Sequence, residues 1–154
     1  MQRCNSIYNH PLYQERTKFI DDAEKERIFC RHNLEHALDV ARIGYIMILE
    51  NGLDISKELF YAAALLHDAG RYSGKKHNES GAELALSVMP ECGFTKDEAK
   101  LVSDAILAHR TDYSSGEFSK VLYEADKKSR ICFMCKAQSE CYWENEKRNL
   151  EIEV

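Results

Sequence analysis

The stretch AAALLHDAG at residues 62–70 joins an apolar helical segment to a His-Asp pair, and it organises the rest of the chain. Five apolar residues come first, which indicates a buried helix whose end carries His67 and Asp68. An imidazole beside a carboxylate suits a divalent metal ion. Adjacent helical residues point about 100° apart, so both reach one ion only where the helix ends. Gly70 is predicted to mark that end with a positive φ. The small residues at 62–64 would let neighbouring helices approach closely and bring further ligands.

Length and charge limit the classes of protein that the chain can belong to. Its 154 residues predict one domain over 1–154 with a substantial core. A net charge of −5 argues against binding to double-stranded nucleic acid or to an anionic membrane, but it permits a small anionic substrate. No run of 18 apolar residues occurs and residues 1–14 lack an apolar core, so neither a membrane span nor a signal peptide is expected. We therefore expect a cytoplasmic protein whose six cysteines are thiols or metal ligands rather than disulfides.

Helices are the only regular elements that the pattern predicts. Two prolines and seven glycines are spread along the chain, and strict period-two alternation is absent. The fold class is therefore all-α, a single-domain bundle of about six or more helices. The expected helices cover residues 11–28 (opened by Pro11), 34–50, 54–69 (capped by Asp54 or Ser56), 79–89 (stopped by Pro90), 95–108 (with a Thr95-Glu98 capping box) and 119–133 (capped by Ser119).

Polar residues able to bind metal recur about once per expected helix. His36 lies on the apolar stripe of 34–50, His77 precedes the next helix, His109 ends the one after, and Asp126 follows Leu122 and Ala125 on the last. A helical bundle that directs one ligand from each of several helices to a shared centre is a common way to build a metal site.

Three ordered segments carry a resemblance to a known family: His36-Ala37-Leu38-Asp39-Val40-Ala41, Leu65-Leu66-His67-Asp68-Ala69-Gly70-Arg71 and Tyr123-Glu124-Ala125-Asp126-Lys127. Together they resemble the HD-domain family of metal-dependent phosphohydrolases over residues 30–130, which leaves 131–154 as a Cys-bearing C-terminal extension. The additional His77 and His109 are similar to those of a dinuclear branch that includes bacterial diadenosine-tetraphosphate hydrolases. The resemblance implies cleavage of a phosphoester or phosphoanhydride. Arg110-Thr111-Asp112 departs from the Thr-Gly pattern expected in that branch, so the substrate stays open.

The ligand set implies one or two divalent ions, with Fe, Mn, Zn, Ni, Co and Mg all open. One ion would be held by His36, His67, Asp68 and Asp126, and a second would add His77 and His109. Asp68, which has two carboxylate oxygens, is the candidate to bridge ions and take a proton, so Asp68 and His67 are the predicted catalytic residues. Candidate contacts to phosphate or substrate are Arg71, Lys75, Lys76, Arg110, Lys127, Tyr72 (stacking on a base) and His32.

The predicted function is metal-dependent hydrolysis of a small phosphorylated compound, with a nucleotide as the favoured substrate. A metal-bearing module that binds a nucleotide without turnover is the alternative from another class. A remoter alternative is a zinc protease, because His32-Asn33-Leu34-Glu35-His36 spells an inverted protease motif. The sequence leaves open whether the protein is a monomer or a homodimer.

Three cysteines in the extension form half of a metal-binding motif. Cys132, Cys135 and Cys141 could hold zinc or an iron–sulfur cluster if Cys4 or Cys30 supplied a fourth thiolate. A second Cys-x-x-Cys pair is missing, so free thiols are the other interpretation. Tyr142-Trp143 is expected to anchor the extension to the core.

Overall fold

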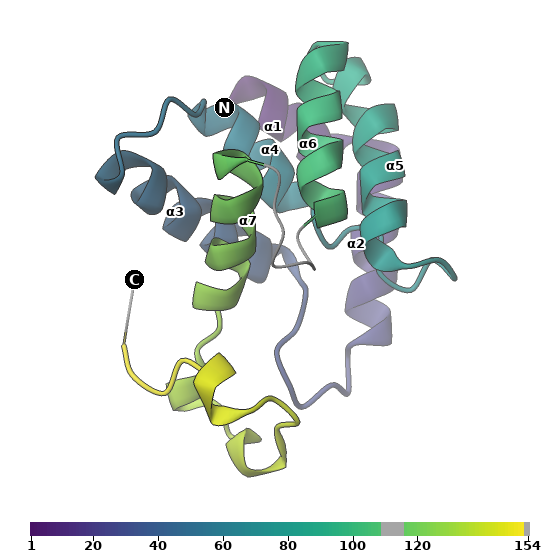
Figure 1. Ribbon diagram of the computed structural model, residues 1–154. Coiled ribbons are helices and arrows are strands. Elements are labelled where there is room, and N and C mark those ends of the chain that lie inside the picture. Colours follow the sequence, from purple (N-terminus) through teal and green to yellow (C-terminus); the bar gives the residue numbers. More distant parts are fainter. Residues whose placement is uncertain (109–115, 153–154) are drawn as a thin grey trace.

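Helix α4 (Lys57–Leu66) lies at the centre of the computed structural model, which describes residues 1–108 and 116–152 (Figure 1). It contacts α1, α3, α5, α6 and α7. The described residues contain no strand, which confirms the all-α prediction. The other helices are α1 (Gln2–Asn9), α2 (Pro11–Ala23), α3 (Leu34–Glu50), α5 (His77–Glu91), α6 (Lys96–Ala108) and α7 (Glu117–Lys128), followed by the 3₁₀ turns η1 (Cys132–Met134), η2 (Gln138–Glu140) and η3 (Asn145–Lys147).

The small side chains of α4 allow this central position. Ala62, Ala63 and Ala64 are completely buried, so the backbones of neighbouring helices can approach that of α4. On α3, Gly44 serves the same purpose, because a Cβ at that position would lie 2.2 Å from the Phe60 ring of α4. The prediction that residues 62–64 permit close helix packing is confirmed.

Side-chain caps fix the starts of three helices where the sequence predicts them. The Asn33 side chain accepts a hydrogen bond from the His36 amide at 3.1 Å, and Ser56 caps α4. At α6, the Glu98 amide donates to the Thr95 hydroxyl and the Thr95 amide donates to the Glu98 carboxylate, which is the predicted capping box. These caps set the register of α3, which carries His36, and of α4, which His67 directly follows.

The prediction of one helix over 11–28, opened by Pro11, is confirmed at its start and wrong at its end. An additional helix, α1, precedes it, and His10 between them is extended because a residue before proline disfavours the helical conformation. Helix α2 ends at Ala23, and Glu24 follows as its C-terminal cap.

Helix α4 ends at Leu66 and not at the predicted residue 69, and two later helices also differ from the predictions. Helix α5 begins at His77 and continues past Pro90 to Glu91; a proline in the last turn deprives only the Leu86 carbonyl of its helical donor, and Leu86 is exposed to water. Helix α7 begins at Glu117 after Gly116, so Ser119 is a buried residue inside the helix rather than its cap. It ends at Lys128, before the predicted 133.

Gly70 is needed for a different reason from the predicted one. It is not among the glycines with positive φ. Instead, the start of α5 lies directly against it, so that a Cβ on Gly70 would be 2.2 Å from the Gly81 nitrogen and 2.3 Å from the His77 carbonyl oxygen. Because residue 70 has no side chain, α5 can pack directly beside the His-Asp pair.

The C-terminal tail, residues 131–152, lies below α7 in Figure 1 and faces the loop that joins α2 to α3. Tyr142 contacts Phe29 of that loop edge-on at 5.9 Å, and the Arg130 guanidinium lies 4.4 Å from the centre of the Trp143 ring. The Tyr142-Trp143 pair thus meets the loop and the end of α7. Within the described residues, no helix combines the length and apolarity that a bilayer crossing requires.

Candidate metal centre and its pocket

Four side chains from three helix ends converge at one point. His36 comes from the first turn of α3, His67 and Asp68 directly follow α4, and Asp126 lies in the last turn of α7. One ligand atom from each of the four lies within 4.8 Å of the others; His67, Asp68 and Asp126 are buried and His36 is partly exposed. Two imidazoles and two carboxylates at this spacing are a suitable donor set for a divalent transition metal.

Hydrogen bonds orient both imidazoles toward this centre. The Nδ1 of His67 is 2.8 Å from the Ala64 carbonyl oxygen, to which it donates, so its Nε2 is the basic nitrogen. The Ser129 hydroxyl donates to the Asp126 carbonyl at 2.8 Å, which leaves its oxygen to accept from His36 Nδ1 at 3.3 Å. Sequence reasoning missed Ser129, because nothing local to it indicates that it faces a residue 93 positions earlier.

The electrostatics of the centre also match a cation. His36 Nε2 is buried and makes no hydrogen bond, although it lies 3.4 Å from Asp126 Oδ1 and 3.6 Å from Asp68 Oδ2. Burial lowers the pKa of His36, but the Asp126 and Asp68 carboxylates outweigh it and raise that pKa to about 9. Burial likewise opposes ionisation of both carboxyl groups, yet the neighbouring histidines hold the pKa of Asp68 and of Asp126 well below the usual range. The charged pocket therefore fits a metal ion, which would take the place of the His36 proton.

The two oxygens of Asp68 face different neighbours. Its Oδ2 lies 3.3 Å from His67 Nε2, whereas its Oδ1 lies 3.1 Å from the Arg71 guanidinium and 3.7 Å from His77 Nε2. His77, at the start of α5, is therefore beside the four-residue set on the outer side of Asp68. The predicted contributions of His109 and Arg110 lie outside the described residues.

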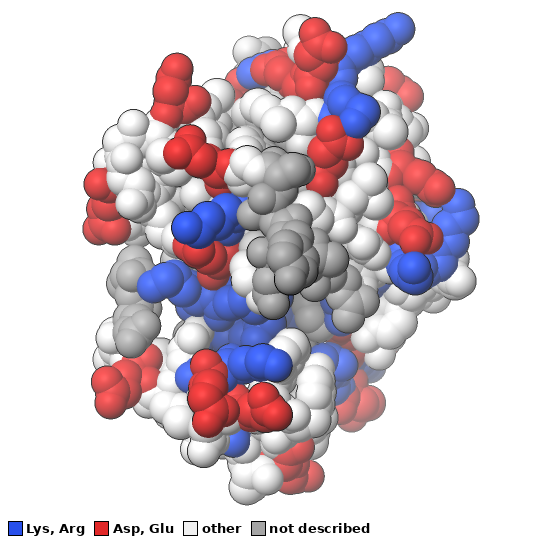
Figure 2. Space-filling model, viewed as in Figure 1, with Lys and Arg blue, Asp and Glu red and all other residues white. Residues whose placement is uncertain are grey.

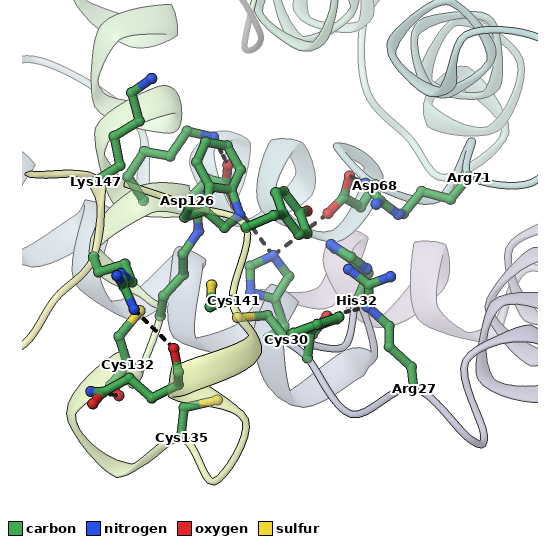
Figure 3. A pocket seen from close by; sticks show the side chains of 18 of the residues that line it. Arg27, Cys30, His32, Asp68, Arg71, Asp126, Cys132, Cys135, Cys141 and Lys147 are labelled. Carbon is green, nitrogen blue, oxygen red and sulfur yellow. Dashed lines mark hydrogen bonds and ion pairs between the residues drawn. The ribbon is translucent and has the colours of Figure 1, made fainter. Parts of the chain in front are cut away.

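A cavity of about 330 Å³ opens from this centre toward the tail (Figure 3). Among the described residues that line it, six are Lys or Arg and two, Asp68 and Asp126, are acidic. Figure 2 shows blue side chains gathered in the hollow between the helical body and the tail. The cations are Arg27, Arg71, Lys127, Arg130, Lys147 and Arg148, and the aromatic lining residues are Phe29, Tyr142 and Trp143. A chain of net charge −5 thus presents a locally cationic pocket beside its candidate metal centre.

A buried carboxylate, Glu24, organises one wall of the cavity. It accepts hydrogen bonds from the His32 amide at 2.7 Å, from His32 Nδ1 at 2.6 Å and from the Tyr72 hydroxyl at 2.8 Å. Burial raises its pKa, but the His32 and Tyr72 contacts prevail and lower that pKa to about 2. Sequence analysis did not identify Glu24 as a site residue, because it resembles the other charged residues near the end of the helix.

The predicted substrate residues divide into two groups. His32, Arg71 and Lys127 line the cavity, and Lys127 also pairs with Asp126 Oδ2. Lys75, Lys76 and Tyr72 do not line it: Lys75 pairs with Glu83, Lys76 with Glu79, and the Tyr72 hydroxyl is held by Glu24.

The zinc-protease motif is not assembled as a helical pair. His32 precedes α3, its Nδ1 is held by Glu24, and Glu35 is exposed and outside the cavity lining. His36 joins His67 and the two aspartates instead.

All six cysteines are free thiols. Four of them, Cys30, Cys132, Cys135 and Cys141, line the same cavity, whereas Cys4 and Cys92 are buried in the hydrophobic core. Partial burial raises the pKa of the Cys30 thiol, and the nearby Cys132 and Cys135 raise it further while Arg130 lowers it. Of the two predicted fourth partners, the structure brings Cys30 to the tail cysteines.

A family model described as "HD domain" matches residues 33–137, which include all four residues of the candidate centre. The chain belongs to the HD domain family. An HD-domain crystal structure, that of a "predicted HD superfamily hydrolase" from an uncultured Thermotogales bacterium, superposes with a TM-score of 0.65 at 28% identity, covering 90% of this chain and 78% of that one. The predicted HD resemblance and fold are confirmed.

Similarity also extends to individual HD-domain relatives. An uncharacterized protein of Clostridium beijerinckii is 39% identical over 99% of both chains. The bifunctional uridylyltransferase/uridylyl-removing enzyme of Cereibacter sphaeroides is 35% identical over 68% of this chain, and ribonuclease Y of a Sulfurovum species is 32% identical over 64% of it. These matches take in 10% and 18% of the two larger proteins, respectively.

Proposed function

We propose that this HD-domain protein is a metal-dependent phosphohydrolase that acts on a small phosphorylated compound, with a nucleotide as the favoured substrate. The observation that carries the proposal is the junction of two features: four oriented ligand atoms within 4.8 Å, and a cavity beside them lined by six cationic side chains. The first suits a metal ion and the second suits phosphate oxygens.

His36, His67, Asp68 and Asp126 would hold the ion. When bound, a divalent ion lowers the pKa of a coordinated water and neutralises charge on phosphoryl oxygens. The protein's own groups prepare for this: Ala64 and Ser129 fix the tautomers of the two histidines, and both aspartates are ionised at neutral pH. Arg71 restrains Asp68 through a hydrogen bond of 3.1 Å and leaves its other oxygen directed at the centre.

The position of His77 supports a second ion in the same proposal. Asp68 has one oxygen toward His36 and His67 and the other toward His77, which is the arrangement that a carboxylate bridging two ions adopts. A second ion held by Asp68, His77 and the predicted His109 would place this chain in the dinuclear branch. That branch includes diadenosine-tetraphosphate hydrolases, which is one reason why a nucleotide is the favoured substrate.

The cavity favours a substrate with more than one phosphate. Arg71 and Lys127 contact the two aspartates, and Arg27 and Lys147 line the same cavity as further cations for additional phosphate groups. Phe29, Tyr142 and Trp143 offer flat apolar surface for a base. Uridylyl removal and ribonuclease action, which name two of the similar proteins, both concern nucleotides.

The test is release of phosphate or nucleoside phosphate from a nucleotide panel by full-length protein loaded separately with Mn, Fe, Co, Ni, Zn and Mg. We expect turnover of at least one nucleotide, lost in Asp68→Asn and kept in Asp104→Asn, an exposed aspartate paired with Lys100 on α6. Nucleotide binding without turnover under every metal would refute hydrolysis and favour the alternative, a nucleotide-binding module.

A further inference from the structure

The metal centre leaves the four cysteines around the same cavity unexplained. Figure 3 shows Cys30, Cys132, Cys135 and Cys141 on the tail side of the cavity, apart from Asp68 and Asp126. Cys30 belongs to the loop between α2 and α3, and the other three belong to the tail, more than 100 residues later. Thiols from two distant segments thus meet where the tail faces the loop, and all of them are free.

The tail buries little apolar surface. Of its described residues, only Cys132 and Ala137 are buried, and neither belongs to the main hydrophobic core. Ile131, Met134 and Tyr142 are more than 60% exposed. Segments that bury so little apolar surface are commonly stabilised by a metal or a covalent link.

Two cationic side chains in this region carry buried donors that make no hydrogen bond. These are Nη1 of Arg130 and Nε of Arg148, and both residues line the cavity with the four cysteines. Arg148 already donates from its other nitrogens to the Gln138 carbonyl and the Asn145 side chain, which fixes the guanidinium in place. Buried cationic donors without partners indicate a missing anionic group.

We propose that Cys30, Cys132, Cys135 and Cys141 together ligate an iron–sulfur cluster that fastens the tail to the α2–α3 loop. A four-iron cluster with four thiolates carries a net charge of about −2, which Arg130 and Arg148 would offset. A single zinc ion is less suitable, because Zn–S bonds of about 2.3 Å draw the four sulfurs to within about 4 Å of one another. Among the described residues, the only group of three or more side chains placed closely enough to hold one metal ion is the His-Asp set, so the four thiols are not gathered as a single zinc ion would require.

The test begins with full-length protein purified without oxygen. We expect broad visible absorption, with about four iron and four acid-labile sulfide per chain, apart from metal at the His-Asp centre. Cys30→Ser and Cys135→Ser should lose most of the absorption and sulfide. Cys4→Ser is the matched control, since the Cys4 thiol donates to the Glu58 carbonyl at 3.1 Å, far from the tail, and a hydroxyl can do the same. Asp126→Asn should retain the sulfide, which separates this centre from the proposed hydrolytic one.

Three results would overturn the proposal. They are no sulfide or visible absorption even after anaerobic addition of ferrous iron and sulfide, stoichiometric zinc on the thiolates in place of the cluster, and a Cys30→Ser protein that keeps the full cluster. Should a variant fail to fold, thiol alkylation of the wild type decides the matter. With iron and sulfide bound, Cys30, Cys135 and Cys141 should resist iodoacetamide, and after removal of the iron and sulfide these three should react, while the buried Cys4 and Cys92 stay unmodified in both states. Rapid alkylation of Cys30, Cys135 and Cys141 in cluster-loaded protein contradicts the assignment.

Discussion

The packing of Gly70 against the first turns of α5 makes the site sensitive to one methyl group. In Gly70→Ala, the new Cβ would lie 2.2 Å from the Gly81 nitrogen and 2.3 Å from the His77 carbonyl oxygen, whereas ordinary contacts begin at 3.4 Å. The start of α5 must therefore retreat by about 1.2 Å, because both neighbours are backbone atoms and neither can rotate away. Overpacking of this kind costs about 1–3 kcal/mol of folding free energy.

Gly70→Ala should reduce activity even under conditions in which the protein stays folded. His77 lies only 3.7 Å from Asp68 Oδ1, so a shift of about 1.2 Å changes this contact substantially. We expect Gly70→Ala to remain folded at 15 °C while its phosphohydrolase rate falls at least tenfold and its content of a second metal equivalent drops. Urea unfolding, metal analysis and the rate assay would be run on the same preparation.

Gly44→Ala is the control for destabilisation alone. Its Cβ would lie 2.2 Å from the Phe60 ring, so it strains the α3–α4 contact without touching α5. It should lose comparable stability but keep the His77-dependent metal when folded. A Gly70→Ala protein with wild-type metal content and rate, or a Gly44→Ala protein with the same functional defect, would refute the reasoning.

Three further predictions follow from the hydrogen bonds and charges of the site. Ser129→Ala removes the acceptor of His36 Nδ1 and should weaken metal binding about 10- to 100-fold in a competition assay with a chelator; unchanged affinity contradicts the positioning role. Glu24→Gln should lose about 3 kcal/mol of stability at pH 7, because the folded pKa of Glu24, about 2, lies below the ordinary value of 4.5. That stabilisation is fully present above pH 4.5 and disappears as the pH falls toward 2, so urea unfolding curves of variant and wild type should converge over this range, and a constant difference would show another cause. Since the pKa of His36 is about 9 without metal, binding of Ni²⁺ should release a proton and tighten about tenfold per pH unit between pH 7 and 9, and titrations in two buffers that detect no proton release contradict this.

Local sequence patterns predicted helix starts and the candidate metal centre wherever a single residue or residue pair is enough to determine the feature. The Ser56 cap and the Thr95-Glu98 capping box fixed helix starts, because each cap satisfies donors within its own first turn. The His67-Asp68 pair after an apolar helix identified the centre, since burial of such a pair requires a compensating partner.

Residues whose roles depend on a partner far away in the sequence could not be identified from local patterns. Glu24 and Ser129 act through His32 and His36, and no local pattern distinguishes them from other polar residues near helix ends. Gly70 was assigned a positive φ because sequence shows that a glycine is present and not whether the backbone or a neighbouring helix requires it. Cys30 remained one of two possible fourth thiols until the loop and the tail were placed together.

Anomalous diffraction from crystals of Mn²⁺- or Ni²⁺-loaded protein tests the central claim most directly. We expect an anomalous peak within about 2.0–2.3 Å of the Nε2 atoms of His36 and His67 and of carboxylate oxygens of Asp68 and Asp126. A loaded crystal in which these four side chains keep their positions, with no peak among them and the ion elsewhere, would contradict it.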